Sequence, residues 1–172
     1  VYRTTNGKEL TVIEDNDAEK SMSTLTLIPF GFTENATTTI ETNKLNKVIL
    51  FDMNKDGNDE IILVTTSVYS GNHSEAIIFT TASSSSLLRV QIPDITEEST
   101  VPGSLFEGYT GLDTFNLIND IAFIRSFPIY ISSGTEMLPN GKMREIIYEL
   151  KENQGDYFIY FKKNNLTATS TN

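Results

Sequence analysis

The chain has 172 residues, no cysteine and a formal net charge of −10, with 13 Lys plus Arg against 23 Asp plus Glu. This length suits one domain that needs no disulfides, and the lack of cysteine excludes thiolate catalysis and cysteine-based zinc sites. An acidic surface disfavours nucleic acid and anionic membranes as partners. No apolar stretch approaches the ~20 residues of a membrane span.

Short runs in which Phe, Tyr, Ile and Val alternate with Ser and Thr fill the chain, and no segment keeps a helical period. This pattern predicts an all-β fold, an antiparallel β-sandwich or flattened barrel. We expect a single β domain over residues 1–165 and a disordered polar tail over 166–172. The absence of an internal repeat argues against a multi-bladed propeller.

The strands of the first half follow from turn signals. The pair Asn6-Gly7 predicts a tight hairpin between residues 2–5 and 9–14. A strand over residues 24–32 contains Pro29, which indicates an edge or a bulge. The Thr-rich residues 34–43 are expected to be irregular. Residues 45–51 and 61–68 should then pair as a hairpin whose tip is an acidic loop.

The second half predicts a strand at residues 75–81 and a long surface loop with a short helix over 93–103. A turn at Asn119-Asp120 should join two strands. Residues 124–131 contain Pro128 and are expected to form an edge-like strand, followed by a loop over 132–141. A final hairpin is expected from residues 143–151 and 156–163.

The acidic loop has the spacing of a calcium site. Position one is Asp52, and Gly57 at position six permits a tight turn. An EF-hand also needs a glutamate at position twelve, where this chain has Leu63, so the stretch instead resembles the calcium loops of FG-GAP and similar β repeats. The alternative is a solvated turn without metal. The expected ligands of a structural calcium ion are Asp52, Asn54, Asp56, Asn58 and Glu60.

A second polar loop follows the next strand. It offers a hydroxyl, a close-approaching glycine, an amide and an imidazole, which are hydrogen-bond donors on a small tip. The same residue types also make an ordinary hairpin turn. The residues of this loop are Tyr69, Ser70, Gly71, Asn72 and His73. About 25 Å of strand should separate it from the acidic loop, so a cation there could only stiffen the hairpin.

The order of several motifs resembles the bacterial periplasmic inhibitors of invertebrate-type lysozyme. The motifs are Asp52 to Glu60, Ser70-Gly71, Gly108-Tyr109-Thr110-Gly111-Leu112-Asp113-Thr114-Phe115, Phe127 to Tyr130, and Pro139 to Arg144. The resemblance implies an antiparallel β fold and a Ser-Gly loop that enters the lysozyme cleft, where its hydroxyl meets the catalytic carboxylates. It also implies a periplasmic or secreted location, although the chain itself shows no signal peptide.

Two residues depart from the family pattern, and they bear on which type of lysozyme the chain would inhibit. His73 stands where a Tyr is expected, and Leu112 stands where a His would fit. The expected partner is a lysozyme, and an acidic inhibitor would meet a basic lysozyme faster.

The alternative function is a calcium-stabilised extracytoplasmic β binding module without inhibitory activity. We expect no enzymatic activity, because the chain has one His and no recognisable phosphate loop or His-pair metal motif, and its carboxylates, such as Asp113 and Glu107, cannot be paired in a cleft from sequence.

Overall fold

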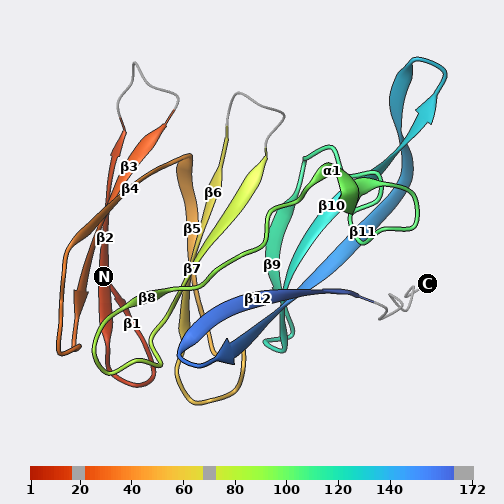
Figure 1. The fold of residues 1–172 in the computed structure, drawn as a ribbon. Coiled ribbons are helices and arrows are strands. Elements are labelled where there is room, and N and C mark those ends of the chain that lie inside the picture. The colour runs from red at the N-terminus through yellow and green to blue at the C-terminus, as the bar shows by residue number, and fades with distance from the viewer. Residues whose placement is uncertain (17–21, 68–72, 165–172) are drawn as a thin grey trace.

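The computed structural model describes residues 1–16, 22–67 and 73–164, and these form three antiparallel sheets of four strands each (Figure 1). The tail predicted for residues 166–172 lies outside the described residues. The first sheet contains β1 (Tyr2–Arg3), β2 (Glu9–Asn16), β3 (Ser23–Phe30) and β4 (Thr38–Thr42). The middle sheet contains β5 (Lys44–Phe51), β6 (Glu60–Thr66), β7 (Ser74–Thr80) and β8 (Leu88–Arg89). The third sheet contains β9 (Thr114–Ile118), β10 (Ala122–Ser133), β11 (Glu136–Asn153) and β12 (Asp156–Lys163).

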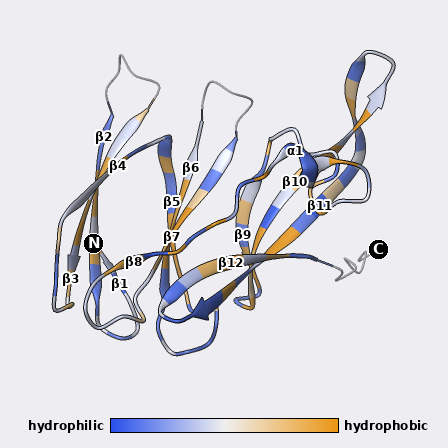
Figure 2. Ribbon diagram, viewed as in Figure 1, coloured by the Kyte–Doolittle hydropathy of each residue, from blue (hydrophilic) through white to orange (hydrophobic). Residues whose placement is uncertain are grey.

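The middle sheet is covered on both faces. Because successive side chains of a strand point to opposite faces, Ile61 and Leu63 of β6 pack into one core, whereas Ile62 and Val64 pack into another. The first core lies against the first sheet and includes Leu25 of β3. The second lies against the third sheet and is rich in aromatic side chains. The hydrophobic colouring of Figure 2 marks parts of β7 and β11 that face these cores. The predicted all-β sandwich is confirmed, and no sheet of the described residues closes on itself.

Pro29 of β3 and Pro128 of β10 occupy stretches with a neighbouring strand on one side only. β4 pairs with β3 up to Leu27, so Pro29 lies beyond that pairing. β9 pairs with β10 up to Ser126, so Pro128 also lies beyond its end, next to a register shift with β11. A proline has no N–H to donate to a ladder and is tolerated at such places. The prediction of edge-like strands is nevertheless wrong, because β3 lies between β2 and β4, and β10 lies between β9 and β11; each proline is accommodated where one of these neighbours has ended.

Two predictions of irregular structure are wrong. Residues 34–43 include β4, because Ile40 packs against the first core and the neighbouring threonines favour strand. The loop predicted over 132–141 is instead the end of a long hairpin, with Ser133 opposite Glu136 and Gly134 in the turn at φ 67°. The Asn140-Gly141 pair, which favoured the end of a loop there, lies within β11.

The remaining hairpins agree with the sequence. The Asn6-Gly7 turn joins β1 and β2, and the acidic loop joins β5 and β6 with Phe51 opposite Glu60. Asn119 and Asp120 both have positive φ, as a primed turn requires. The helix α1 (Glu97–Thr100) has four residues, and no helix among residues 1–16, 22–67 and 73–164 is long and apolar enough to cross a membrane.

Candidate functional site

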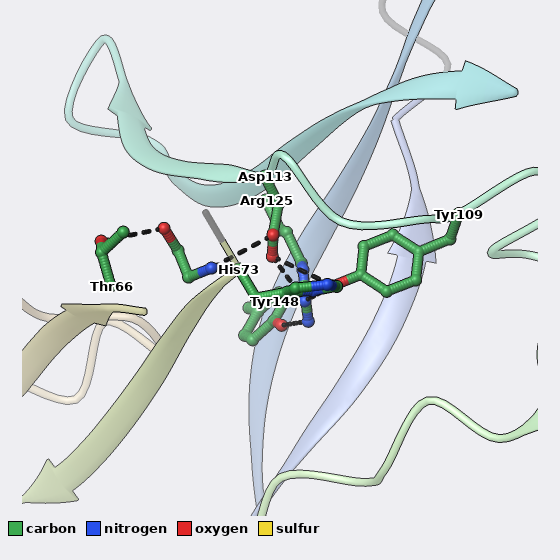
Figure 3. Close-up of polar contacts among 7 residues, drawn as sticks. Thr66, His73, Tyr109, Asp113, Arg125 and Tyr148 are labelled. Atoms are coloured by element: carbon green, nitrogen blue, oxygen red, sulfur yellow. Dashed lines mark hydrogen bonds and ion pairs between the residues drawn. The ribbon is translucent and has the colours of Figure 1, made fainter. Parts of the chain in front are cut away.

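A buried ion pair lies between the middle and third sheets (Figure 3). Asp113, just before β9, approaches Arg125 of β10 with Oδ2 to Nη2 at 2.5 Å, and the two residues are only 3% and 9% exposed. The guanidinium also donates to the hydroxyls of Tyr109, at 2.5 Å, and Tyr148, at 3.3 Å. Asp113 Oδ1 accepts the backbone N–H of Ser74 at 3.2 Å. The pair therefore fixes the first residue of β7 to the third sheet.

The protonation of this cluster follows from its burial. Burial raises the pKa of Tyr109 to about 12, although Arg125 opposes the shift. Burial likewise raises the pKa of Tyr148. Burial alone would lower the pKa of Arg125, but Tyr148, Asp113 and Tyr109 outweigh it and raise that pKa. Both phenols therefore stay protonated and the guanidinium stays charged throughout the physiological range.

His73 is the one residue of the predicted inhibitory loop that lies within the described part of the chain, because Tyr69, Ser70, Gly71 and Asn72 fall outside it. Its carbonyl accepts the N–H of Ser67 at 2.9 Å, which closes the neck of the loop. The half-buried imidazole turns toward the cluster, with Nδ1 3.4 Å from the Tyr109 hydroxyl. His73 thus lies at the base of the loop and contacts its own domain.

Gly111 makes room for this imidazole. A Cβ added at Gly111 would lie 2.4 Å from His73 Cε1, and Gly111 has φ +100°, which other residues rarely adopt. The Gly-x-Asp spacing of the motif therefore leaves room at Gly111 for the His73 imidazole and places the Asp113 carboxylate beside the Ser74 N–H. The neighbouring Leu112 is 43% exposed at φ 57° and does not contribute to this packing.

The other motif segments meet at the same place. The carbonyl of Gly108 accepts the N–H of Tyr130 at 2.9 Å, and Tyr130 pairs with Pro139 of β11. The Tyr109 ring lies edge-on to the buried Phe127 with centroids 4.9 Å apart. Arg144 lies opposite Phe127 and donates to the carbonyls of residues 104 and 105. Residues 108–113 therefore contact the loop neck directly, and residues 127–130 of β10 support that segment in turn.

We predict that Gly108→Ala destabilises the domain more than Gly134→Ala. Both glycines have positive φ, but a Cβ at Gly108 would lie 2.6 Å from the Tyr130 carbonyl oxygen, whereas nothing lies within 4 Å at Gly134. The control should lose about 1 kcal/mol through backbone strain, and Gly108→Ala about 1–3 kcal/mol more through overpacking. Urea unfolding of both variants measures the difference. Equal losses would mean that Gly108 is not closely packed against β10.

The predicted metal ligands lie in a turn that is closed by its own hydrogen bonds. Asp52 accepts the N–H groups of Asp56 and Gly57 at 3.1 and 2.8 Å, and Asp56 Oδ1 accepts the N–H of Asn58 at 2.8 Å. Asn54 donates to Asp56 at 3.0 Å. Within the described ranges, no three acidic or His side chains form a cluster able to hold a metal. Each carboxylate oxygen nevertheless has more than one lone pair, so acceptor capacity remains.

Glu60 differs from the other four because it is fully buried. Its carboxylate accepts the N–H of Met53 at 2.8 Å and the hydroxyl of Thr80 at 2.9 Å. Burial raises the pKa of Glu60 to about 7, the nearby Asp56 and Asp52 add to the rise, and the two hydrogen bonds oppose it. A buried carboxyl with no cationic partner among the described residues is therefore built into the root of the β5–β6 hairpin.

Sequence reasoning missed Arg125 and Tyr148. A usable signal existed for Arg125: it alternates with Phe123 and Phe127, so a charged side chain shares the inward face of β10 with two phenylalanines. Its partner, 12 residues earlier in a loop, could not be identified from spacing.

The chain matches no protein-family model, and neither a curated protein nor a solved structure is similar enough to it to count as a match.

Proposed function

We propose that this protein inhibits a lysozyme by inserting the loop that contains Ser70 and Gly71 into the enzyme's active-site cleft. The observation that carries the proposal is the packing of the motif segment from Gly108 to Asp113 against the neck of that loop. Asp113 bonds to Ser74, Gly111 accommodates His73, and Gly108 joins the same support to β10. The motif segment from Gly108 to Asp113 therefore supports the loop that the resemblance implicates in inhibition.

The chemistry of the target explains why a rigid donor-bearing loop would inhibit it. Retaining glycosidases carry two carboxylates about 5 Å apart, and lysozyme keeps one protonated and one ionised. Ser70 and Asn72 would supply the hydroxyl and amide donors, as predicted from sequence. Because His73 packs against Tyr109, we assign it the positioning of the loop and not a direct bond to the catalytic carboxylates. A preorganised neck lowers the entropy lost on binding.

The charge of the chain supports a basic partner. With a net charge of −10, long-range attraction would raise the association rate with a cationic lysozyme and make it fall with added salt. The proposal therefore includes a periplasmic or secreted location, where such an enzyme would be met.

The test is a cell-wall lysis assay with invertebrate, chicken and goose types of lysozyme. We expect inhibition of at least one type by the native chain. The double variant Ser70→Ala with His73→Ala should weaken it about 30-fold or more, which is the scale of a 2 kcal/mol hot spot. Ser84→Ala, an exposed serine in a different turn, is the matched control. Absence of inhibition of all three types by the native chain would reject the proposal and leave the β binding module as the function to test.

We also propose that the acidic loop holds a structural calcium ion through Asp52, Asn54, Asp56, Asn58 and Glu60. All five are oxygen donors, the ligand type that calcium prefers, and they lie on one turn. Calcium at 100 times its Kd would stabilise the fold by about 2.7 kcal/mol, which is several degrees in melting temperature. Calorimetry in EGTA and then in excess calcium measures this shift. Identical melting temperatures in the two buffers would exclude calcium from the loop.

A further inference from the structure

A groove of about 740 Å³ opens beside β7, on the side away from β6. We name it the β7 groove; it is bounded by residues 40–42 of β4, 75–78 of β7, the segment 89–95, and Arg125 and Tyr148. Its volume is in the range of protein ligand sites. His73, the described residue of the inhibitory loop, is not part of this lining, and the groove is argued from residues outside that loop, so its role does not depend on the proposed function.

One edge of β7 is unpaired along the groove. β8 pairs with β7 only at Phe79 and Thr80, after which the chain leaves β7 and Gln91 bridges to Phe158 of β12. The last contact on this side is the N–H of Val90 to the carbonyl of Ile78. Among the described residues, no strand covers β7 on this side from residue 74 to residue 77. Such an edge is a template for pairing with another chain.

The hydrogen-bonding direction of this edge follows from two contacts. The Ser74 N–H points away from β6 to Asp113, and the Ile78 carbonyl points away from β6 to Val90. Because backbone groups of a strand alternate between its two sides, Ala76 between them also presents its N–H and C=O to the groove. In the described part of the chain, the N–H and C=O of Ala76 have no hydrogen-bond partner on this side. An added strand would supply one.

A buried donor lies at the depth of the groove. Arg125 is 9% exposed, and its Nε has no hydrogen-bond partner among the described residues, while its Nη atoms are used by Tyr109, Tyr148 and Asp113. A buried unpaired donor costs about 1–3 kcal/mol.

The rim of the groove is acidic. Glu41, Glu75 and Asp94 line it and are exposed, whereas Arg89 is the one exposed cation of the lining and the charge of Arg125 is matched by Asp113. The walls of the groove inside this rim are formed by aliphatic side chains, including Ile78 and Ile92. This combination of an open edge, aliphatic walls and excess carboxylates suits a strand with alternating apolar and basic side chains.

We propose that the β7 groove binds an extended, basic peptide segment of a partner protein, which adds to the free edge of β7 as a further strand. About three residues of the peptide, spanning about 10 Å, pair with residues 75–77. Its backbone satisfies Ala76, and its basic side chains meet the three rim carboxylates. Apolar side chains on the opposite face of the peptide strand lie against Ile78 and Ile92.

The test uses three synthetic hexapeptides titrated into the ¹⁵N-labelled chain and followed by NMR. The first alternates lysine and valine, the second replaces lysine by glutamate, and the third replaces one of the two middle residues of the first by proline, which removes a backbone N–H. We expect shifts of the Ala76 and Ile78 amides with the first peptide only, and affinities at least tenfold weaker for the other two. Equal binding of all three, or no shift at these amides with about 5 mM of the first, would overturn the proposal.

A matched pair of variants of the chain tests the charge contribution. Glu75→Lys places a cation at the rim, and Glu136→Lys makes the same change at an exposed strand position of the distant β10–β11 hairpin. The first should weaken the lysine–valine peptide at least fivefold, and the second should leave its affinity unchanged. If both variants bind alike, the rim does not select a basic peptide and the proposal fails.

Discussion

Asp113→Ala is expected to lower the free energy of unfolding by about 3–5 kcal/mol, the loss found when one partner of a buried ion pair is removed. Arg125 would keep its charge with no opposing carboxylate and 9% exposure, and the Ser74 N–H would lose its acceptor. Both consequences loosen the start of β7 and hence the loop neck. Urea unfolding followed by far-UV circular dichroism measures the loss.

A double variant separates the charge effect from packing. Asp113→Leu combined with Arg125→Met removes both charges and keeps apolar volume, so it should recover much of the stability lost by Asp113→Ala. Asp94→Ala, an exposed aspartate, is the control and should change stability by less than about 0.5 kcal/mol. A single variant Asp113→Ala within 1 kcal/mol of the native chain would show that the pair does not hold the two sheets together.

Glu60 is expected to make the domain less stable as pH rises from about 4.5 to about 7. The folded-state pKa of about 7 lies above the reference value of 4.5, so in this window the folded chain holds a proton that the unfolded chain releases. Stability from the protonated carboxyl is complete below the lower value and is lost as pH passes the higher one. The shift corresponds to an order of 3 kcal/mol.

The variant Glu60→Gln isolates this contribution from the other titrating groups. Its amide carbonyl can accept from Met53 and its NH₂ can donate to the Thr80 hydroxyl, so the contacts are retained without a titrating proton. In EGTA buffer, the stability of the variant relative to the native chain should rise by about 3 kcal/mol from pH 4.5 to pH 8. Parallel stability curves across this range would contradict the raised pKa of Glu60.

The sequence was sufficient for features set by local chemistry. Asn6-Gly7 and Asn119-Asp120 accept positive φ, so their hairpins follow from the residues alone. The burial of β6 was harder to predict, because all four residues from Ile61 to Val64 are apolar and no alternation with polar residues marks one buried face. Such a run indicates burial on both faces, and its meaning became clear only with a third sheet in place.

Tertiary contacts decided what the sequence could not. β4 is Thr-rich and polar, yet it forms because Ile40 finds the first core and β3 offers a free edge. For the candidate site, the Gly108 to Asp113 motif was recognised from sequence, but its partner Arg125 was not, because loop-to-strand contacts leave no fixed spacing. The inward role of His73 likewise depends on the gap at Gly111, which is a property of packing.

Interface mapping by NMR tests most directly the proposal that the loop with its neck at His73 binds a lysozyme. The ¹⁵N-labelled chain is titrated in turn with the invertebrate, chicken and goose types of lysozyme. We predict that the largest amide changes fall on residues 69–73 and on Gly111, with little change at Gly57 in the acidic loop at the far end of β6. Changes centred on the acidic loop, or none on residues 69–73, would contradict the account.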